Sequence, residues 1–519
     1  MSDDQTRTSQ PRVLIAGGGP AGLATAMELA FHGVPSILVE PRASVSHTRP
    51  RAKTTSPRTM ELFRRWGVAH LVRAAAPLQP EWCRKVIFCT TLNGAVITEF
   101  DDAFGMRAEP SDEFAEGGQQ VPQPIVEEVL RTRLQATGSV DLRFGERLTD
   151  LVEARDSVRC RITRNDGSSY SLTVDYVVGC DGAKGVTRDA IGATFAGVSS
   201  PSSNLNTVFR APQLKPLVGE AIHYWVLGPD VKATVGPLDR QGLWWAGLGG
   251  VDATCTAERA VHLLAALTGQ PAEESGIELL ATDPWVPRML IADRFASERV
   301  FLVGESAHVN PPFGGHGFNT CVGDAVNIGW KLAAVLQGWG GRALLSTYES
   351  ERRDVAQQTI DSATRNLRAS GPEIALTADR IQETKHEEFN SLGLVLGYSY
   401  HGSRIVVAAD EPPPFSAVSY TPSTRPGARL PHAWLAPGHA LYDDLGRGFA
   451  LIHPTSASAP ELAVFRRRAD QLGVPLAVVP APDAWPQNEF LLIRPDQHIA
   501  WRGDHLDVTV LPRVVAANV

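Results

Sequence analysis

Three glycines near the start of the chain have the spacing of a phosphate-binding turn. Residues 12–16 (RVLIA) form an apolar run of strand length, and GGGPAG follows with Gly17, Gly19 and Gly22 in the register GxGxxG. A second apolar run, SILVE, ends at Glu40, about 20 residues further on, as the dinucleotide-binding fingerprint requires. Gly17 permits a tight turn, Gly19 leaves room for a pyrophosphate, and Gly22 lets the helix pack against the strand. Strand, loop, helix, strand and acid occur in order, which favours a dinucleotide site over a glycine-rich turn without a ligand.

Two later segments repeat the change from an apolar strand to a glycine-rich loop. Residues 176–189 (YVVGCDGAKGVTRD) run from a strand into Asp181, and residues 299–331 run from a strand into a loop and a long helix. In the second loop, FGGHGFN, the glycines Gly314, Gly315 and Gly317 bring backbone N–H groups close to a ligand at the helix start. Such a nest of N–H groups suits a partial negative charge.

These three segments, in this order, resemble those of the class A flavoprotein monooxygenases, the para-hydroxybenzoate hydroxylase family. The resemblance covers most of residues 12–400. It implies a bound FAD, NADPH or NADH as a transient co-substrate, and dioxygen, with oxygen transferred from a C4a-hydroperoxide of the flavin. Only one GxGxxG occurs, which argues against two-dinucleotide Baeyer–Villiger enzymes and pyridine-nucleotide disulfide reductases.

The resemblance also implies roles for individual positions. Glu40 would bind the adenosine ribose, Asp181 would serve both FAD and NAD(P)H, and Glu305 would meet ribitol or ribose oxygens. The full set implied to bind the cofactor is Gly17, Gly19, Pro20, Ala21, Gly22, Glu40, Arg51, Gln123, Asp181, Glu305, Pro312, Gly314, Gly315, Gly317, Phe318 and Asn319.

Four positions depart from the family pattern. Glu305 replaces the usual aspartate of the late motif, and Gly185 and Thr187 replace a serine and a valine of the middle one. Lys53 stands where some phenol hydroxylases carry an acid, so no acidic base is expected there. No side chain is assigned as a catalyst, because the flavin carries the chemistry.

The expected fold is α/β. It has a Rossmann-type FAD-binding domain, an inserted antiparallel-sheet substrate domain, and a C-terminal thioredoxin-like α/β domain without redox cysteines. Residues 221–249, rich in β-branched and aromatic residues with turn signals, predict the antiparallel strands. Predicted substrate-pocket residues are His223, Trp225, Trp245, Trp285 and Arg288, although aromatic side chains more often simply pack in the core.

The C-terminal part resembles the last domain of phenol 2-monooxygenases, on RPGARLPHAWL, LYDDLGRGFALI and FLLIRPDQHIAWRGD. The expected organisation is a disordered tail (1–11), a discontinuous FAD-binding domain (12–75, 106–190 and 291–365) and a substrate domain (76–105 and 191–290). A helical connection (366–410), a proline-rich linker (411–426) and the thioredoxin-like domain (427–519) complete the chain.

Composition excludes several other classes. The chain has 519 residues, 43% of them hydrophobic, and 49 Lys plus Arg against 57 Asp plus Glu, a net charge of −8. Disorder throughout and nucleic-acid binding are therefore not expected. The six cysteines form no CxxC pair and no zinc-like cluster, so no metal is expected. No signal peptide or membrane-spanning run is visible, which predicts a cytoplasmic protein; a homodimer stays open.

Three functions follow from this sequence. The first is hydroxylation of a phenol, polyphenol or aromatic polyketide, as in antibiotic biosynthesis. The second uses the same cofactor for Baeyer–Villiger or epoxidising chemistry on a polycyclic substrate. The third, from another class, is a flavin-binding protein without turnover. The pose of the substrate decides between the first two, and the sequence does not specify it.

Overall fold

A five-stranded parallel sheet carries the first glycine loop. The computed structural model describes residues 12–48, 53–369, 377–407, 411 and 414–516. The sheet has the order β19-β11-β1-β2-β7, with bounds Val300–Leu302, Tyr176–Gly179, Val13–Ala16, Ser36–Glu40 and Val140–Phe144. The first four of these strands are buried throughout, as expected for parallel strands covered on both faces.

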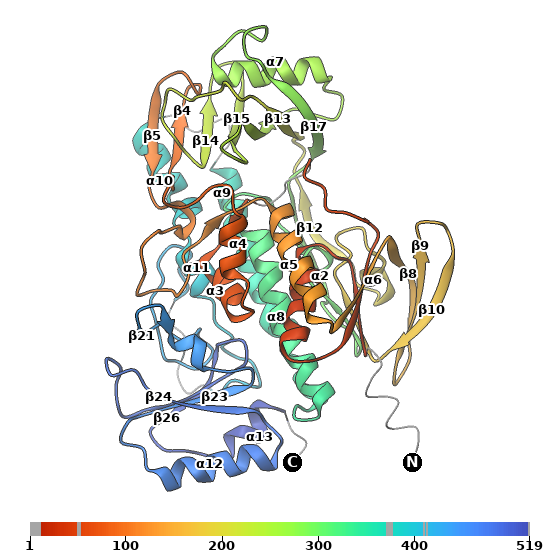
Figure 1. Cartoon of the computed structure of the whole chain (residues 1–519), viewed down its shortest axis with the longest axis vertical. Helices are drawn as coiled ribbons and strands as arrows, with labels where there is room; N and C mark the ends of the chain where they lie inside the picture. The colour runs from red at the N-terminus through yellow and green to blue at the C-terminus, as the bar shows by residue number, and fades with distance from the viewer. Residues whose placement is uncertain (1–11, 49–52, 370–376, 408–410, 412–413, 517–519) are drawn as a thin grey trace.

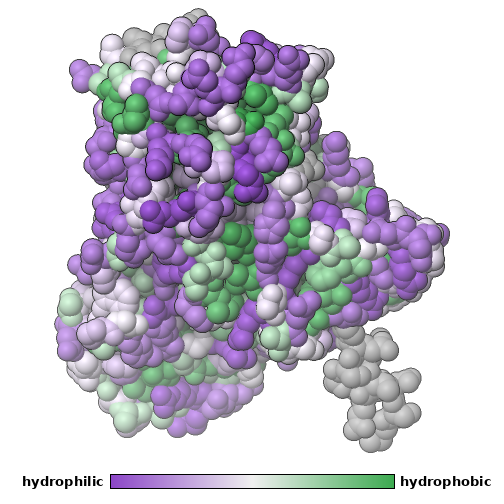
Figure 2. Space-filling view, turned by 45° about the horizontal axis from the view of Figure 1, so that its top comes forward, coloured by the Kyte–Doolittle hydropathy of each residue, from purple (hydrophilic) through white to green (hydrophobic). Residues whose placement is uncertain are grey.

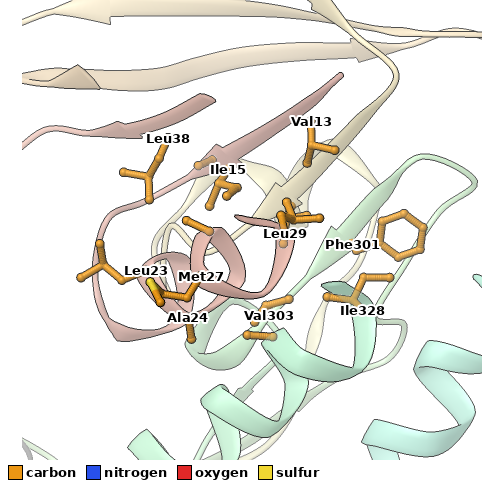
Figure 3. Packing of buried hydrophobic residues seen from close by; sticks show 14 of the residues in the cluster. Val13, Ile15, Leu23, Ala24, Met27, Leu29, Leu38, Phe301, Val303 and Ile328 are labelled. Atoms are coloured by element: carbon orange, nitrogen blue, oxygen red, sulfur yellow. The ribbon is translucent and has the colours of Figure 1, made fainter. Parts of the chain in front are cut away.

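Helices α2 (Pro20–Phe31) and α8 (His316–Gln337) pack beside this sheet and against each other. Both lie at the centre of the view in Figure 1. Figure 3 shows the apolar layer between these elements, with side chains from Val13, Ile15, Leu23, Ala24, Met27, Leu29, Leu38, Phe301, Val303 and Ile328. Burial of these branched side chains supplies the main stabilisation of this domain.

The sheet brings the three glycine-containing segments to one edge. Ala16, at the end of β1, pairs with Gly179 of β11, and Gly179 pairs with Leu302 of β19. The carboxyl ends of parallel strands point the same way, so the loops that follow them lie side by side. Segments far apart in sequence therefore form one binding edge.

A seven-stranded sheet at the top of Figure 1 forms the second domain. Its order is β17-β13-β16-β15-β14-β4-β5, with bounds Glu278–Trp285, Asn204–Arg210, Leu243–Gly249, Lys232–Pro237, His223–Leu227, Val86–Cys89 and Val96–Phe100. The antiparallel expectation is confirmed except for one pair: β4 runs parallel to β14. More than a hundred residues join these two strands instead of a tight hairpin, so they are free to run parallel.

Helix α7 (Ala257–Thr268) covers one face of this sheet. The alternation of side chains along β14 shows which of its residues point to the opposite face. Tyr224 and Val226 pack in the same apolar cluster as Leu263 and Leu264 of α7. Successive side chains of a strand point to opposite faces, so the odd-numbered residues of β14 face away from α7.

Smaller elements connect the two domains. The short strands β3 and β6 pair with each other, and β12, β18 and β20 form a separate sheet. The bounds are β3 Thr54–Thr55, α3 Pro57–Arg65, α4 Ala69–Ala75, η1 Ala103–Gly105, β6 Gln119–Gln120, α5 Gln123–Thr137, β8 Glu146–Glu153, β9 Val158–Arg164, β10 Ser169–Val174, α6 Val186–Ala190, β12 Phe195–Ser199, β18 Arg288–Ala292, η2 Gly304–Ser306, β20 His308–Val309, η3 Arg342–Leu344, α9 Thr347–Arg368, α10 Ala378–Phe389 and α11 Leu392–Leu396.

The C-terminal unit, at the bottom of Figure 1, contains no cysteine. Its four-stranded sheet has the order β24-β23-β25-β26. Two buried ion pairs join this unit to the preceding helices: Arg494 pairs with Glu351 of α9, and Arg429 pairs with Glu61 of α3. Its elements are β21 Trp434–Ala436, β22 His439–Ala440, η4 Leu441–Asp444, β23 Phe449–His453, α12 Ala459–Gln471, β24 Leu476–Pro480, β25 Phe490–Ile493, β26 Ile499–Gly503 and α13 Val510–Val514. The mixed α/β fold agrees with the expected class.

One face of the molecule is mostly polar. On the face drawn in Figure 2, hydrophilic residues separate the hydrophobic areas. Within the part of the chain that the structure describes, no helix combines the length and the apolar character needed to cross a bilayer.

Candidate functional site

One cavity of about 1510 Å³ runs from the glycine loops to the seven-stranded sheet. At one end it is lined by residues that follow β1, β2, β11 and β19, and at the other by β14, β15 and β16. The predicted residues that line it are Gly17, Gly19, Pro20, Ala21, Glu40, Gln123, Asp181, Glu305, Pro312, Gly314, Gly315, Gly317, Phe318, His223, Trp225, Trp245 and Trp285. Gly22, Asn319 and Arg288 do not line it, and Arg51 and the tail 1–11 lie outside the described residues.

The three glycines of the first loop have different environments. A Cβ at Gly17 (φ 109°) would lie 2.3 Å from the carbonyl oxygen of Cys180, and one at Gly22 would lie 1.8 Å from the Gly17 oxygen. A Cβ at Gly19, the N-cap of α2, would meet nothing within 4 Å. Gly17 and Gly22 are therefore required by the packing of the chain, whereas Gly19 keeps open the space before the helix N-terminus.

Glu40 holds the loop in place as well as facing the cavity. One carboxylate oxygen accepts a hydrogen bond from the backbone N–H of Gly18 at 2.7 Å. The other accepts from the backbone N–H and the Nε of Arg42, at 3.0 and 2.7 Å. The carboxylate is thus fixed at the end of β2, where a ribose would follow a phosphate on Gly19.

Asp181 joins the middle glycine-containing segment (176–189) to the late one (299–331) through hydrogen bonds. It accepts hydrogen bonds from the backbone N–H and the hydroxyl of Thr187, at 3.0 and 2.5 Å, and so caps α6. It also accepts from the hydroxyl of Ser306 at 3.0 Å, next to the exposed Glu305. The threonine at position 187, a departure from the family pattern, therefore has a structural reason.

The late glycine loop turns sharply before α8. Gly314 (φ 87°) and Gly315 (φ 69°) have left-handed backbones, and a Cβ at Gly314 would lie 2.4 Å from Nε2 of His316. His316 is buried beneath the loop, and burial lowers its pKa to about 4. The first turn of α8 presents its backbone N–H groups at this point, as a helix N-terminus does.

Asn319 supports this turn from behind. Its side-chain oxygen accepts from the Ser56 N–H at 2.9 Å and the Thr59 hydroxyl at 2.8 Å. Its amide donates to the Thr54 and Gly315 carbonyls at 3.2 and 2.8 Å. The side chain fixes the helix start relative to β3 and α3 and is not part of the cavity wall.

The sheet end of the cavity is aromatic. His223 and Trp225 project from β14, and Trp245 from β16, with ring centroids of His223 and Trp245 5.7 Å apart. Trp225 stacks on Phe88 at 5.4 Å and lies 6.2 Å from Phe313 of the late loop. A planar, largely apolar ligand would find matching walls here.

The polar atoms at this end have few partners. In the described part of the chain, His223 Nε2 and the indole nitrogens of Trp225, Trp245 and Trp285 make no hydrogen bond. Burial, together with the nearby Lys53, lowers the pKa of His223 well below its usual value. Buried polar groups are normally satisfied, so these rings are suited to a ligand that carries oxygen atoms.

Several lining residues were not predicted as site residues, among them Lys53, Phe104, Asn206 and Phe313. Phe313 stands within the late motif and could have been found there. Lys53 directly precedes β3; its position is one where some phenol hydroxylases carry an acid, but the lysine itself was not predicted to line the site.

Comparison with known proteins gives two family matches. Residues 10–363 match the model described as FAD binding domain, and residues 423–517 match aromatic-ring hydroxylase, C-terminal. Aklavinone 12-hydroxylase RdmE of Streptomyces purpurascens is 31% identical, over 95% of each chain. The 4-methyl-5-nitrocatechol 5-monooxygenase of Burkholderia sp is also 31% identical, over 95% of this chain and 94% of its own.

Two solved structures are similar over almost their whole length. The rebeccamycin biosynthetic enzyme RebC with reduced flavin superposes with a TM-score of 0.87 and 34% identity, covering 98% of this chain and 99% of its own. A ternary complex of aklavinone-11 hydroxylase with FAD and aklavinone gives 0.86 and 30%, with the same coverage.

Proposed function

The chain belongs to the family of FAD-binding aromatic-ring hydroxylases, and on this premise we propose that it is an NAD(P)H-consuming monooxygenase that hydroxylates a phenolic or polycyclic aromatic substrate, polyketides included. The observation that carries the proposal is the continuity of the cavity. Dinucleotide-type loops and aromatic walls belong to one space of about 1510 Å³, large enough for a cofactor and a second ring system.

The residues present fit FAD. Gly19 leaves open space at a helix N-terminus for a pyrophosphate, and Glu40 lies fixed beside it for a ribose. The left-handed Gly314 and Gly315 aim the first turn of α8 at the middle of the cavity, where its N–H groups would stabilise negative charge on a flavin ring. When bound, FAD supplies the redox chemistry: acceptance of a hydride from NAD(P)H and activation of dioxygen for transfer of one oxygen atom.

The protein's own contribution is to position the substrate and to exclude water. Trp225, backed by Phe88, forms an apolar wall with Phe313, and the rings of His223 and Trp245 line the same end of the cavity. Such walls keep bulk water away from the substrate end of the cavity.

The test is the anaerobic rate of flavin reduction by NADPH and by NADH, with and without a panel of hydroxynaphthalenes and hydroxyanthraquinones. We expect at least one aromatic compound to accelerate reduction, and aeration then to give a product heavier by one oxygen atom. Absence of reduction by either nicotinamide would contradict the proposal. Conversion of a cyclic ketone to a lactone, with no phenol oxidised, would replace hydroxylation by Baeyer–Villiger chemistry.

A further inference from the structure

Lys53 connects the two ends of the cavity. It directly precedes β3, whose Thr54 carbonyl accepts from Asn319 in the first turn of α8. From there its side chain reaches the seven-stranded sheet, where Nζ donates long hydrogen bonds to the carbonyls of Ile222 at 3.5 Å and Pro237 at 3.4 Å. The amine therefore lies between the flavin end and the substrate walls.

The sheet leaves room for this amine. At Gly236 of β15, an added Cβ would lie 2.8 Å from Lys53 Nζ and 3.3 Å from Nε1 of Trp245. The amine and the indole N–H thus converge on one small region beside a glycine. Nζ also lies 4.4 Å from the centroid of the Trp245 ring.

Lys53 differs from the other buried lysines of the described chain. Lys331 contacts Glu351 at 2.7 Å, and Lys385 contacts Glu388 at 2.7 Å. Lys53 is 6% exposed, and no carboxylate of the described residues lies within ion-pair distance of it. Burial without a counter-charge lowers the pKa of this amine well below its ordinary value.

The ionisable groups around Lys53 do not compensate its charge. His223, from β14, is neutral because burial and the lysine itself lower its pKa. On α10, Glu388 faces the cavity but is held by Lys385, and Lys232 of β15 is exposed. A buried, uncompensated lysine reduces the stability of a fold, and groups of this kind concentrate at functional sites.

We propose that the amine of Lys53 is the catalytic base that takes the proton from a phenolic or enolic hydroxyl of the substrate. This rests on the proposed function, and it narrows the substrate class to aromatic compounds with an ionisable hydroxyl group next to the carbon that is oxygenated. The substrate O–H bond breaks and an N–H bond forms on Nζ, while the electron pair stays on oxygen. No electron leaves the substrate in this step.

The products of this transfer stabilise each other. An ammonium and a phenolate form a charge pair in a site of low dielectric, and the partnerless indole N–H of Trp245 points to the same region for a second hydrogen bond. The phenolate ring is richer in electrons than the phenol, which favours attack on an electrophilic oxygen. The proton returns to the product oxygen or to water when the product leaves.

The first experiment needs no substrate. It compares the free energy of unfolding of the wild type and of Lys53→Met between pH 7 and pH 11, with Lys215→Met as an exposed control. Between the lowered folded pKa and the unfolded pKa of about 10.4, the unfolded wild type binds more protons, so wild-type stability rises with pH. We expect Lys53→Met to be more stable than the wild type near pH 7, with the difference disappearing as pH rises past the unfolded pKa. Parallel curves for the two proteins would overturn the proposal.

The second experiment uses the FAD-loaded enzyme and 1,8-dihydroxyanthraquinone, whose visible band shifts on ionisation. We expect the bound compound to be ionised at pH 7 in the wild type and protonated in Lys53→Met. Hydroxylation of panel compounds should fall by about 10²-fold or more in that variant, while anaerobic reduction by NADPH persists. Lys53→Arg keeps a cation but cannot accept a proton, so its rate should rise with pH as the free phenol ionises.

The outcomes separate the two proposals. Full activity of Lys53→Arg with an unchanged pH profile would assign Lys53 as a fixed counter-ion for an anionic substrate and overturn the base. If the bound 1,8-dihydroxyanthraquinone kept its ionised band in Lys53→Met, this result would also overturn the role of Lys53 as the base. A wild type that neither reduces its flavin nor oxidises any panel compound would refute the proposed function, while the unfolding curves would still decide the protonation state of Lys53.

Discussion

The two ends of the cavity differ in how their polar groups are satisfied. At the flavin end, Glu40 and Asp181 on the cavity wall and Asn319 behind it each make at least three hydrogen bonds to the protein. At the sheet end, His223 and three tryptophans have ring nitrogens without partners in the described chain, and Lys53 has no counter-charge.

This difference indicates a division of work. The flavin end is a rigid frame that exists before any ligand arrives, because its hydrogen bonds are already made. At the sheet end the protein itself leaves these groups without partners, and each would cost about 1–3 kcal/mol if it stayed unsatisfied. A ligand with oxygen atoms would recover part of that cost, so binding and specificity are expected to concentrate there.

The largest expected effect is the loss of FAD affinity when the open space at Gly19 is filled. Gly19→Leu should fold normally, because a Cβ there meets nothing within 4 Å, yet it should lose FAD affinity by about 100-fold or more, since the side chain fills the phosphate position. The measurement is FAD content after purification, followed by titration of the apoprotein. Gly22→Ala is the contrasting variant: its methyl would lie 1.8 Å from the Gly17 oxygen, so it should fail to fold stably. Full FAD loading in Gly19→Leu would contradict the assignment of this loop.

The flavin end could be predicted largely from the sequence because its requirements are local. A tight turn beside another chain segment needs glycine at Gly17, and a left-handed loop before a helix needs it at Gly315, so the residue types themselves report the backbone. The loops after β1, β11 and β19 are then expected to lie side by side, because the carboxyl ends of parallel strands meet at the same edge of a sheet.

The sheet end could be predicted only in part. Alternation along β14 identified His223 and Trp225, because a period of two assigns faces without any knowledge of the partner. Lys53 reaches the sheet end from just before β3 of the other domain, and such a contact leaves no local pattern. Asn206 belongs to the sheet itself, on β13 beside Gly247 of β16, and was missed because no strand was predicted in detail there. Arg288 pairs with Ser199 in a separate sheet, so the short sequence distance from Trp285 was misleading.

The next prediction concerns the frame of the flavin end. Asn319→Leu removes four hydrogen bonds: three join α8 to β3 and α3, and one goes to Gly315 at the start of α8 itself. At about 0.5–1.5 kcal/mol each, this should lower the free energy of unfolding by about 2–6 kcal/mol. Urea unfolding of the apoprotein measures it, and Asn390→Leu, at a half-buried position after α10 whose hydrogen bond to His386 is exposed, serves as the control. Equal stability of wild type and Asn319→Leu would show that the helix start is held by packing alone.

A matched pair of tryptophans compares a satisfied indole, packed between α2 and α3 outside the cavity, with an unsatisfied one at the sheet end. Trp66 donates its indole N–H to Glu28 at 2.7 Å, whereas the N–H of Trp245 has no partner in the described chain. Both Trp→Phe changes remove similar ring area, so the difference isolates the hydrogen bond. Trp66→Phe should destabilise the apoprotein by about 1.5–3 kcal/mol more than Trp245→Phe, as expected for a bond to a carboxylate. A larger loss of stability in Trp245→Phe than in Trp66→Phe would contradict the distinction between satisfied and unsatisfied indole groups.

The smallest effect is expected at Glu305, whose side chain is exposed on the cavity wall. Exposed charges contribute little because water screens them, so Glu305→Gln should raise the FAD dissociation constant less than about tenfold. Glu305→Asp, which restores the acid typical of the family, should bind FAD as tightly as the wild type or more tightly. Titration of the apoprotein by flavin fluorescence measures both. A loss in Glu305→Gln as large as in Gly19→Leu would mean that the longer acid bonds the cofactor directly, and one exposed carboxylate would then belong to the preformed frame of the flavin end.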